Sequence, residues 1–186
     1  MIKQTLVLLA TLAALPAAWG DFKAGDRLPD LSIADRGELV LEGDDFDYRS
    51  WNYPQQPGKV HVLQYMAATS SASELNDPFI DRLKTDFPTG TLLSTTVLNL
   101  DEALWGTGGF VTSQLESNKK QFPHAVLVAD EKGVGLNTWK LEEDSAAIIV
   151  TDSQGAVLYF KQGAMSPAEV NSTIELIKQQ LPGKAS

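Results

Sequence analysis

The sequence predicts an α/β fold in which helices cover both faces of a mixed β-sheet, and three observations lead to this prediction. From residue 59 onward, apolar β-branched segments alternate with helix-like segments, which is typical of strands joined by crossover helices. Two apolar segments, 147–151 and 156–160, are separated only by Asp152-Ser153-Gln154-Gly155, which predicts a hairpin of antiparallel strands. In the last segment, 166–181, apolar residues recur at the spacing of an amphipathic helix.

The first twenty residues have the features of a secretory signal. Lys3 supplies a positive charge, residues 6–15 are apolar, and Ala18-Trp19-Gly20 places small residues at the two positions that a signal peptidase reads. The apolar run is too short to span a bilayer comfortably. We therefore expect residues 1–20 to be a signal peptide cleaved near Gly20/Asp21, and residues 21–186 to form a single exported domain without a membrane anchor.

Composition excludes several functional classes. The 186 residues include no cysteine, so the chain has no disulfide, no thiol nucleophile and no cysteine-bound zinc. The net charge is −9, from 15 basic and 24 acidic residues. Nucleic-acid-binding proteins need a basic surface for the phosphates, so we expect no nucleic-acid partner.

The first half of the folded region contains two strongly marked strands. Residues 21–58 are polar and rich in turn residues, with one short strand candidate at Glu38–Leu41. Strands are expected at 59–66 and 91–100, where apolar and β-branched residues gather. Between them, Ser71 and Glu74 have the spacing of a capping box and predict a helix over 71–84. Pro78 must kink this helix or begin a second one.

The second half continues the alternation of elements. Glycines at 106–109 lead to a helix expected over 110–121, and residues 125–129 form a third core strand. In the last helix, Ser166 is the expected cap, Pro167 the first helical residue and Glu169 the partner in a capping box. The buried stripe of this helix is expected to consist of Val170, Ile174, Ile177 and Leu181.

This order of elements resembles the thioredoxin fold, and one local pattern strengthens the resemblance. In extracytoplasmic thioredoxin-like proteins, a Gly-Lys-Val sequence opens a strand that leads to a Cys-x-x-Cys motif, with a proline five residues further on. Here Gly58-Lys59-Val60 opens the strand, Ser70-Ser71-Ala72-Ser73 stands at the motif, and Pro78 follows. Serine therefore occupies both cysteine positions, and the resemblance implies the fold without the redox chemistry.

The second landmark of that fold is a cis-proline that faces the cysteines. Its place is expected at Ser145-Ala146, just before the strand at 147–151, and no proline is present there. We call Ser70, Ser73, Ser145 and Ala146 together the serine corner. If the resemblance holds, these four residues lie at a degenerate active site and are candidates for ligand contact.

A second resemblance, to the YtfJ family of periplasmic thioredoxin-like proteins without established activity, covers the whole region after residue 20. It is carried by residues 35–41 (Asp-Arg-Gly-Glu-Leu-Val-Leu), by residues 116–120 (Glu-Ser-Asn-Lys-Lys) and by the segment 145–152. This resemblance implies a bacterial protein located in the periplasm. It implies no reaction.

Other chemistry-bearing residues favour structural roles. His61 and His124 each lie at the start of an expected strand, and we interpret Ser70 and Ser73 as helix-capping residues. Residues 42–47 and Glu142-Glu143-Asp144 are interpreted as solvated acidic turns, although the second should approach the serine corner. Glycines 106, 108 and 109 lack a phosphate-binding signature. Four aromatic residues are expected in loops, where they could form a binding surface: Trp51, Tyr53, Trp105 and Trp139.

Two functions remain. The first is a non-redox module that holds a peptide, protein or small ligand at the serine corner, with no catalytic residue, cofactor or metal. The second is an enzyme with other chemistry at the same place, for instance a hydrolase that uses Ser70 or Ser73. A base and a third group within reach of either serine would favour the hydrolase, whereas an apolar groove would favour the binding module.

Overall fold

The computed structural model describes residues 20–54, 58–104 and 106–181. Strands and helices alternate from β3 to β5, as the sequence predicts, and the unpredicted helix α4 lies between β5 and β6. Every expected strand after residue 58 begins and ends within two residues of its prediction. The elements, in chain order, are β1 (Leu31–Glu42), β2 (Asp45–Tyr53), β3 (His61–Ala67), α1 (Ser70–Glu74), α2 (Asp77–Asp86), β4 (Leu93–Asn99), the 3₁₀ helix η1 (Leu100–Glu102), α3 (Gly108–Gln121), β5 (Val126–Asp130), α4 (Val134–Trp139), β6 (Ala146–Thr151), β7 (Val157–Gln162) and α5 (Pro167–Gln180).

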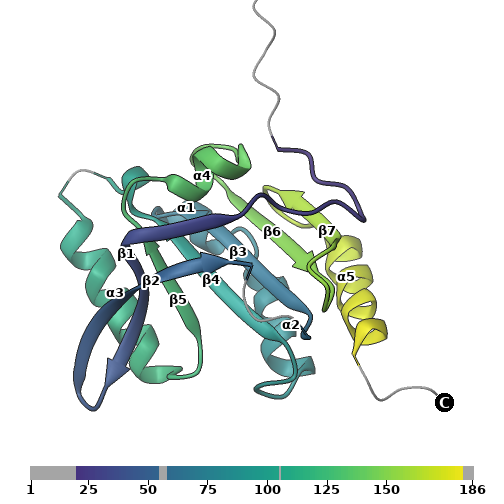
Figure 1. Ribbon diagram of the computed structural model, residues 1–186, viewed down its shortest axis with the longest axis horizontal. Coiled ribbons are helices and arrows are strands. Elements are labelled where there is room, and N and C mark those ends of the chain that lie inside the picture. Colours follow the sequence, from purple (N-terminus) through teal and green to yellow (C-terminus); the bar gives the residue numbers. More distant parts are fainter. Residues whose placement is uncertain (1–19, 55–57, 105, 182–186) are drawn as a thin grey trace, which may run out of the picture.

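The strands form one seven-stranded mixed sheet in the order β2-β1-β5-β4-β3-β6-β7 (Figure 1). The three central strands β5, β4 and β3 are mutually parallel, and every other neighbouring pair is antiparallel. The crossover helices α2 and α3 connect the parallel strands, which cannot be joined by a tight turn. The carboxyl ends of β3, β4 and β5 therefore lie along the same edge of the sheet.

Side chains on the two faces of the sheet enter different apolar clusters, because successive residues of a strand point to opposite sides. Val62 and Ile148 face α2 and α5, whereas Leu63 and Ile149, the next residues on the same strands, enter a cluster around Trp139 of α4. A third cluster lies under α3 and includes Leu115 and Leu127. Helices therefore cover both faces, with α2, α3 and α5 on one side and the short α4 on the other.

The region before residue 58 differs from its prediction. In place of one short strand, β1 and β2 form a long hairpin. Polar residues alternate with aromatic residues along β2; Trp51 and Tyr53 are buried, and Phe46 and Tyr48 pack partly buried against the cluster under α3. Most residues of this segment are polar, so the alternation of buried and exposed positions that is typical of a strand is hard to recognise in its sequence. The acidic segment 42–47 forms the tight turn of this hairpin and the start of β2.

The predicted helix over 71–84 is divided into α1 and α2. Pro78 lies in the first turn of α2, so it begins a second helix rather than kinking a single one. Between the helices, the buried Asn76 donates to the carbonyl oxygen of Gly163 (3.2 Å) and accepts from the backbone N–H of Met165 (2.9 Å). These long-range contacts fix the break in the chain.

The final helix agrees with its prediction. Ser166 caps α5 and forms the complete capping box with Glu169, and Pro167 is the first helical residue. Val170, Ile174 and Ile177 are buried against β3 and β6, and Leu181 packs at the border of the same cluster. The helix α4, by contrast, is too short to have been recognised from its apolar spacing. In the part of the chain that the structure describes, no helix is long and apolar enough to cross a membrane; residues 1–19 of the expected signal lie outside it.

Candidate functional site

The serine corner lies at the edge of the sheet where the parallel strands end. Ser70 begins α1 directly after β3, and Ala146 at the start of β6 is paired with Met66 near the end of β3. The backbone N–H of Ala67 donates to the carbonyl oxygen of Ser145 (2.9 Å). The structure thus places the two halves of the serine corner at neighbouring strand ends, although they are more than seventy residues apart in the sequence.

The hydroxyl groups at this corner do not make the predicted helix cap. The residue that caps α1 is Thr69, whose Oγ1 accepts from the N–H of Ala72 (3.3 Å). Ser73 donates its hydroxyl to the carbonyl oxygen of Ser70 (2.9 Å), and the side chain of Ser70 is exposed to solvent. The interpretation of Ser70, Ser71 and Ser73 as capping residues was wrong, because α1 begins one residue before Ser71 and threonine fills the cap position. Ser70 therefore presents an exposed hydroxyl.

Both histidines lie at the opposite edge of the sheet. His61 opens β3 and His124 precedes β5, and both strands run toward the serine corner. The His61 ring is 5% exposed, contacts Thr95 Oγ1 through Nε2 (2.9 Å), and packs against the Tyr53 ring. Burial lowers the pKa of His61 to about 4. Neither imidazole can serve as a base for Ser70 or Ser73.

A carboxylate that the sequence analysis did not single out organises the corner. Glu102, in η1 after β4, accepts from Asn99 Nδ2 (2.6 Å) and from the backbone N–H of Asp144 (2.5 Å). Burial raises the pKa of Glu102, and the nearby charges of Asp144 and Glu143 raise it further. Its two oxygens join the end of β4 to the loop before β6. The position of Asn99 and Glu102 directly after a buried strand is the sequence signal that could have indicated this role.

The acidic segment 142–144 does approach the serine corner, as expected. Asp144 adopts a left-handed backbone conformation (φ 51°), which aspartate tolerates better than most residues. This turn directs its N–H to Glu102 and places Ser145 beside the end of β3, where its carbonyl oxygen accepts from the N–H of Ala67. No group of three or more His, Asp or Glu side chains is placed to hold a metal ion in the described ranges.

Beneath the corner, a buried pair holds the strand ends together. The Tyr65 hydroxyl near the end of β3 donates to Asp130 Oδ2 at the end of β5 (2.8 Å). Asp130 also accepts the N–H groups of Val134 (2.8 Å) and Gly135 (2.7 Å), which begin α4. Burial, and then the charge of Asp130, raise the pKa of Tyr65. The floor of the corner is therefore a fixed hydrogen-bonded unit.

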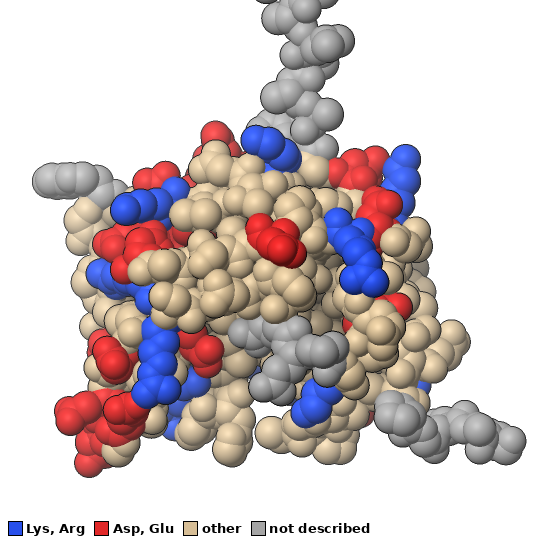
Figure 2. Space-filling model, viewed as in Figure 1, with Lys and Arg blue, Asp and Glu red and all other residues tan. Residues whose placement is uncertain are grey.

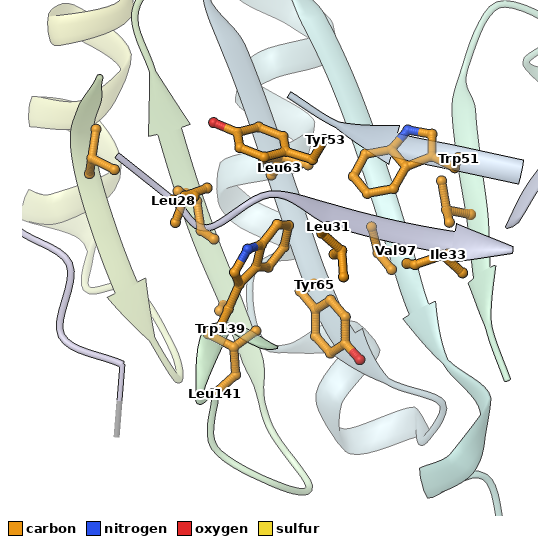
Figure 3. Close-up of a cluster of buried hydrophobic side chains, with 14 residues drawn as sticks. Leu28, Leu31, Ile33, Trp51, Tyr53, Leu63, Tyr65, Val97, Trp139 and Leu141 are labelled. Carbon is orange, nitrogen blue, oxygen red and sulfur yellow. The ribbon is translucent and has the colours of Figure 1, made fainter. Parts of the chain in front are cut away.

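The aromatic residues expected in loops lie in regular elements and do not form a binding surface among the described residues. Trp51, Tyr53 and Trp139 are core residues; Trp139 forms edge-to-face contacts with the rings of Tyr53 (centroids 5.6 Å apart) and Tyr65 (6.3 Å), as Figure 3 shows. Trp105 lies outside the described residues. The loop placement of Trp51, Tyr53 and Trp139 is wrong because these residues belong to β2 and α4.

Exposed apolar side chains are present elsewhere at the same edge. Leu104, after η1, is 68% exposed, and Phe110, in the first turn of α3, is 74% exposed. Between the start of α3 and the end of β5 lies a cleft of about 370 Å³. It is lined by Arg36, Leu100, Gly108, Gly109, Thr112, Ser113, Glu116 and Glu131. Gly108 and Gly109 thus border a cleft and begin α3.

Comparison with known proteins identifies relatives along almost the whole chain. A family model described as "Bacterial protein of unknown function (YtfJ_HI0045)" matches residues 22–180. The uncharacterized protein YtfJ of Escherichia coli K12 is 41% identical over 181 residues, which cover 97% of this chain and 98% of that protein. An uncharacterized protein of Haemophilus influenzae is 32% identical, over 95% and 97% of the two chains.

Solved structures of thiol:disulfide exchange proteins show the same fold. One of them, a Chlorobium tepidum protein named as the thiol:disulfide interchange protein DsbE, has a TM-score of 0.57 at 16% identity and covers 86% of this chain and 99% of its own. The chain therefore has a thioredoxin-like fold without cysteines, and it belongs to the YtfJ family of bacterial proteins of unknown function.

Proposed function

We propose that this protein is a non-redox binding module of the bacterial periplasm that holds an extended polypeptide at the serine corner. The observation that carries this proposal is the exposure of two large apolar side chains, Leu104 and Phe110, at the edge where β3 and β4 end. Exposed apolar groups rimmed by polar residues are characteristic of protein-binding surfaces.

The polar groups of the corner complement such a ligand. The exposed Ser70 hydroxyl can donate to or accept from a peptide backbone. Glu102 and Asp130 hold the surrounding loops in place, so the surface is pre-organised and little ordering is required when the ligand binds. An extended polypeptide offers both the apolar side chains and the backbone groups that this combination would recognise.

The alternative of a serine hydrolase receives no support from the described residues. A catalytic serine needs a base within hydrogen-bond reach, and His61 and His124 are at the far edge of the sheet. Both oxygens of Glu102, the carboxylate near the corner, already accept hydrogen bonds. A binding role requires no such base.

The proposed location rests on residues 1–20. Their charge, apolar run and small residues before Asp21 fit a cleaved export signal. Mass analysis of the protein recovered from the periplasmic fraction should give a chain that begins near Asp21. A chain that retains Met1 and stays with the membranes would refute export.

Binding can be tested with a panel of cysteine-free, extended peptides that contain or lack large apolar residues, followed by NMR titration of the protein. The Leu104→Ser/Phe110→Ser variant should bind the apolar peptides roughly tenfold more weakly or worse, since contact residues of this kind dominate interface energies. Phe122→Ser is the matched control, because Phe122 is also exposed (45%) but lies at the other end of α3. Equal affinity of the first variant and the wild type, or no preference for apolar peptides, would refute the proposal.

A further inference from the structure

The strand β2 forms one border of the sheet, and in the described part of the chain no strand pairs with its outer side. At the other border, the N-terminal segment pairs with the start of β7: Gly25 donates to the carbonyl oxygen of Val157 (2.8 Å), and Val157 donates to that of Asp26 (2.8 Å). Within the described residues, β2 has backbone partners only in β1. An open border strand is a template for pairing with another chain.

The hairpin register determines which backbone groups of β2 face outward. Glu42 pairs with Asp45 across a two-residue turn, so Asp45, Asp47 and Arg49 exchange hydrogen bonds with β1. The alternate residues Phe46, Tyr48 and Ser50 then direct their N–H and C=O groups away from the sheet. In agreement, the N–H of Tyr48 donates to the Asp47 carboxylate (2.8 Å) and not to β1.

A second copy of this strand is complementary to the first in charge. Suppose that two antiparallel β2 strands pair about a twofold axis at Tyr48. The outward backbone groups of Tyr48 then pair with those of Tyr48 in the second copy, and those of Phe46 pair with those of Ser50 in the second copy. Asp47 then lies directly opposite Arg49 of the second copy, and Arg49 opposite Asp47. Both side chains are exposed on the face of the sheet away from α3, and Arg49 pairs there with Glu42 of its own β1. Opposite charges at such positions stabilise strand pairing, and like charges oppose it.

We propose that β2 pairs with β2 of a second copy, so that two chains form a continuous sheet with a twofold axis at Tyr48. Asp47 exchanges its local contact with the Tyr48 N–H, and Arg49 its ion pair with Glu42 of β1, for an ion pair between the two copies. In Figure 2, acidic and basic side chains lie side by side at the lower left, where Figure 1 places the hairpin tip. Pairing of one strand from each chain buries less surface than a standard interface, so the dimer is weak and concentration-dependent.

Charge reversal at two positions tests the register directly. The protein, purified in the form that the cell accumulates, is examined by sedimentation velocity from about 10 μM to about 1 mM. Asp47→Arg places arginine opposite arginine, and Arg49→Asp places aspartate opposite aspartate. For each variant alone, the dissociation constant of the dimer should therefore rise by about tenfold or more. An equimolar mixture of the two variants restores both opposite-charge pairs and should form a heterodimer as readily as the wild type.

The double exchange Asp47→Arg/Arg49→Asp should likewise restore the dimer. Asp81→Arg on α2, an exposed position far from β2 in the sequence, is the control for net charge and should behave as the wild type. A wild type that stays monomeric up to the highest concentration would overturn the proposal. So would single variants that dimerise normally, which would assign the dimer to another surface. A monomer that forms a complex only with a different protein through β2 would assign this border to a heterologous strand and also refute the second-copy proposal.

Discussion

His61 should make the folded protein less stable in mild acid. Its ring is buried at the start of β3, in contact with Thr95 and Tyr53, and burial lowers its pKa from 6.5 to about 4. In the unfolded chain the same group titrates near its ordinary value. Between pH 6.5 and about 4, the unfolded state therefore binds more protons than the folded state, and stability falls as the pH falls through this window.

The size of the effect follows from the two pKa values. At pH 7 the His61 ring is neutral in most of both the folded and the unfolded molecules, so almost no stability is lost to its protonation. Proton linkage then predicts a loss of about 2 kcal/mol at pH 5 and about 3 kcal/mol at pH 4.

Urea unfolding at a series of pH values measures this loss. His61→Gln removes the titrating group, so the difference in unfolding free energy between variant and wild type should shrink from pH 7 to pH 5 by about 2 kcal/mol. Comparing differences cancels the fixed packing cost of the substitution and the titration of shared carboxylates. His124→Gln, at an exposed position of the same sheet edge, is the control and should keep the wild-type loss. Parallel curves for His61→Gln and the wild type would refute the reasoning.

Three further predictions concern the core, the corner and redox chemistry. Ile174→Ala removes a fully buried side chain of α5 and should lower the unfolding free energy by about 2–5 kcal/mol; a cost within experimental error would show that this face of α5 does not pack. Glu102→Ala leaves the N–H groups of Asn99 and Asp144 without their acceptor and should cost about 1–3 kcal/mol in urea unfolding. Glu102→Gln keeps an acceptor oxygen and should cost less; an equal cost would show that charge dominates. The wild type should not catalyse disulfide exchange, which requires a thiolate. The Ser70→Cys/Ser73→Cys variant should form an internal disulfide and show a thiol pKa below that of free cysteine, about 8.5; separate thiols with an ordinary pKa would contradict the equivalence of this turn to a Cys-x-x-Cys motif.

The serine corner illustrates how far local sequence signals reach. The strand that ends before Ser70, the place of Pro78 and the segment before β6 could all be predicted, because buried parallel strands are continuous apolar runs and proline restricts the start of a helix. The capping role was assigned to Ser71 when Thr69 fulfils it. An error of this kind arises because hydroxyl residues at 69, 70, 71 and 73 are nearly equivalent by propensity, and only the exact position of the strand end selects among them.

The sequence by itself determined the absence of thiol chemistry, the order of the strands after residue 58, and the capped final helix with its stripe at Val170, Ile174 and Ile177. Each depends on residue identity or on the spacing of near neighbours. Only the tertiary structure decided that Trp51 and Trp139 are core residues, that Glu102 joins η1 to Asp144, and that both histidines lie away from the serine corner. These relations join residues that are distant in the chain. They depend on strand order, and local periodicity carries no information about which strands become neighbours.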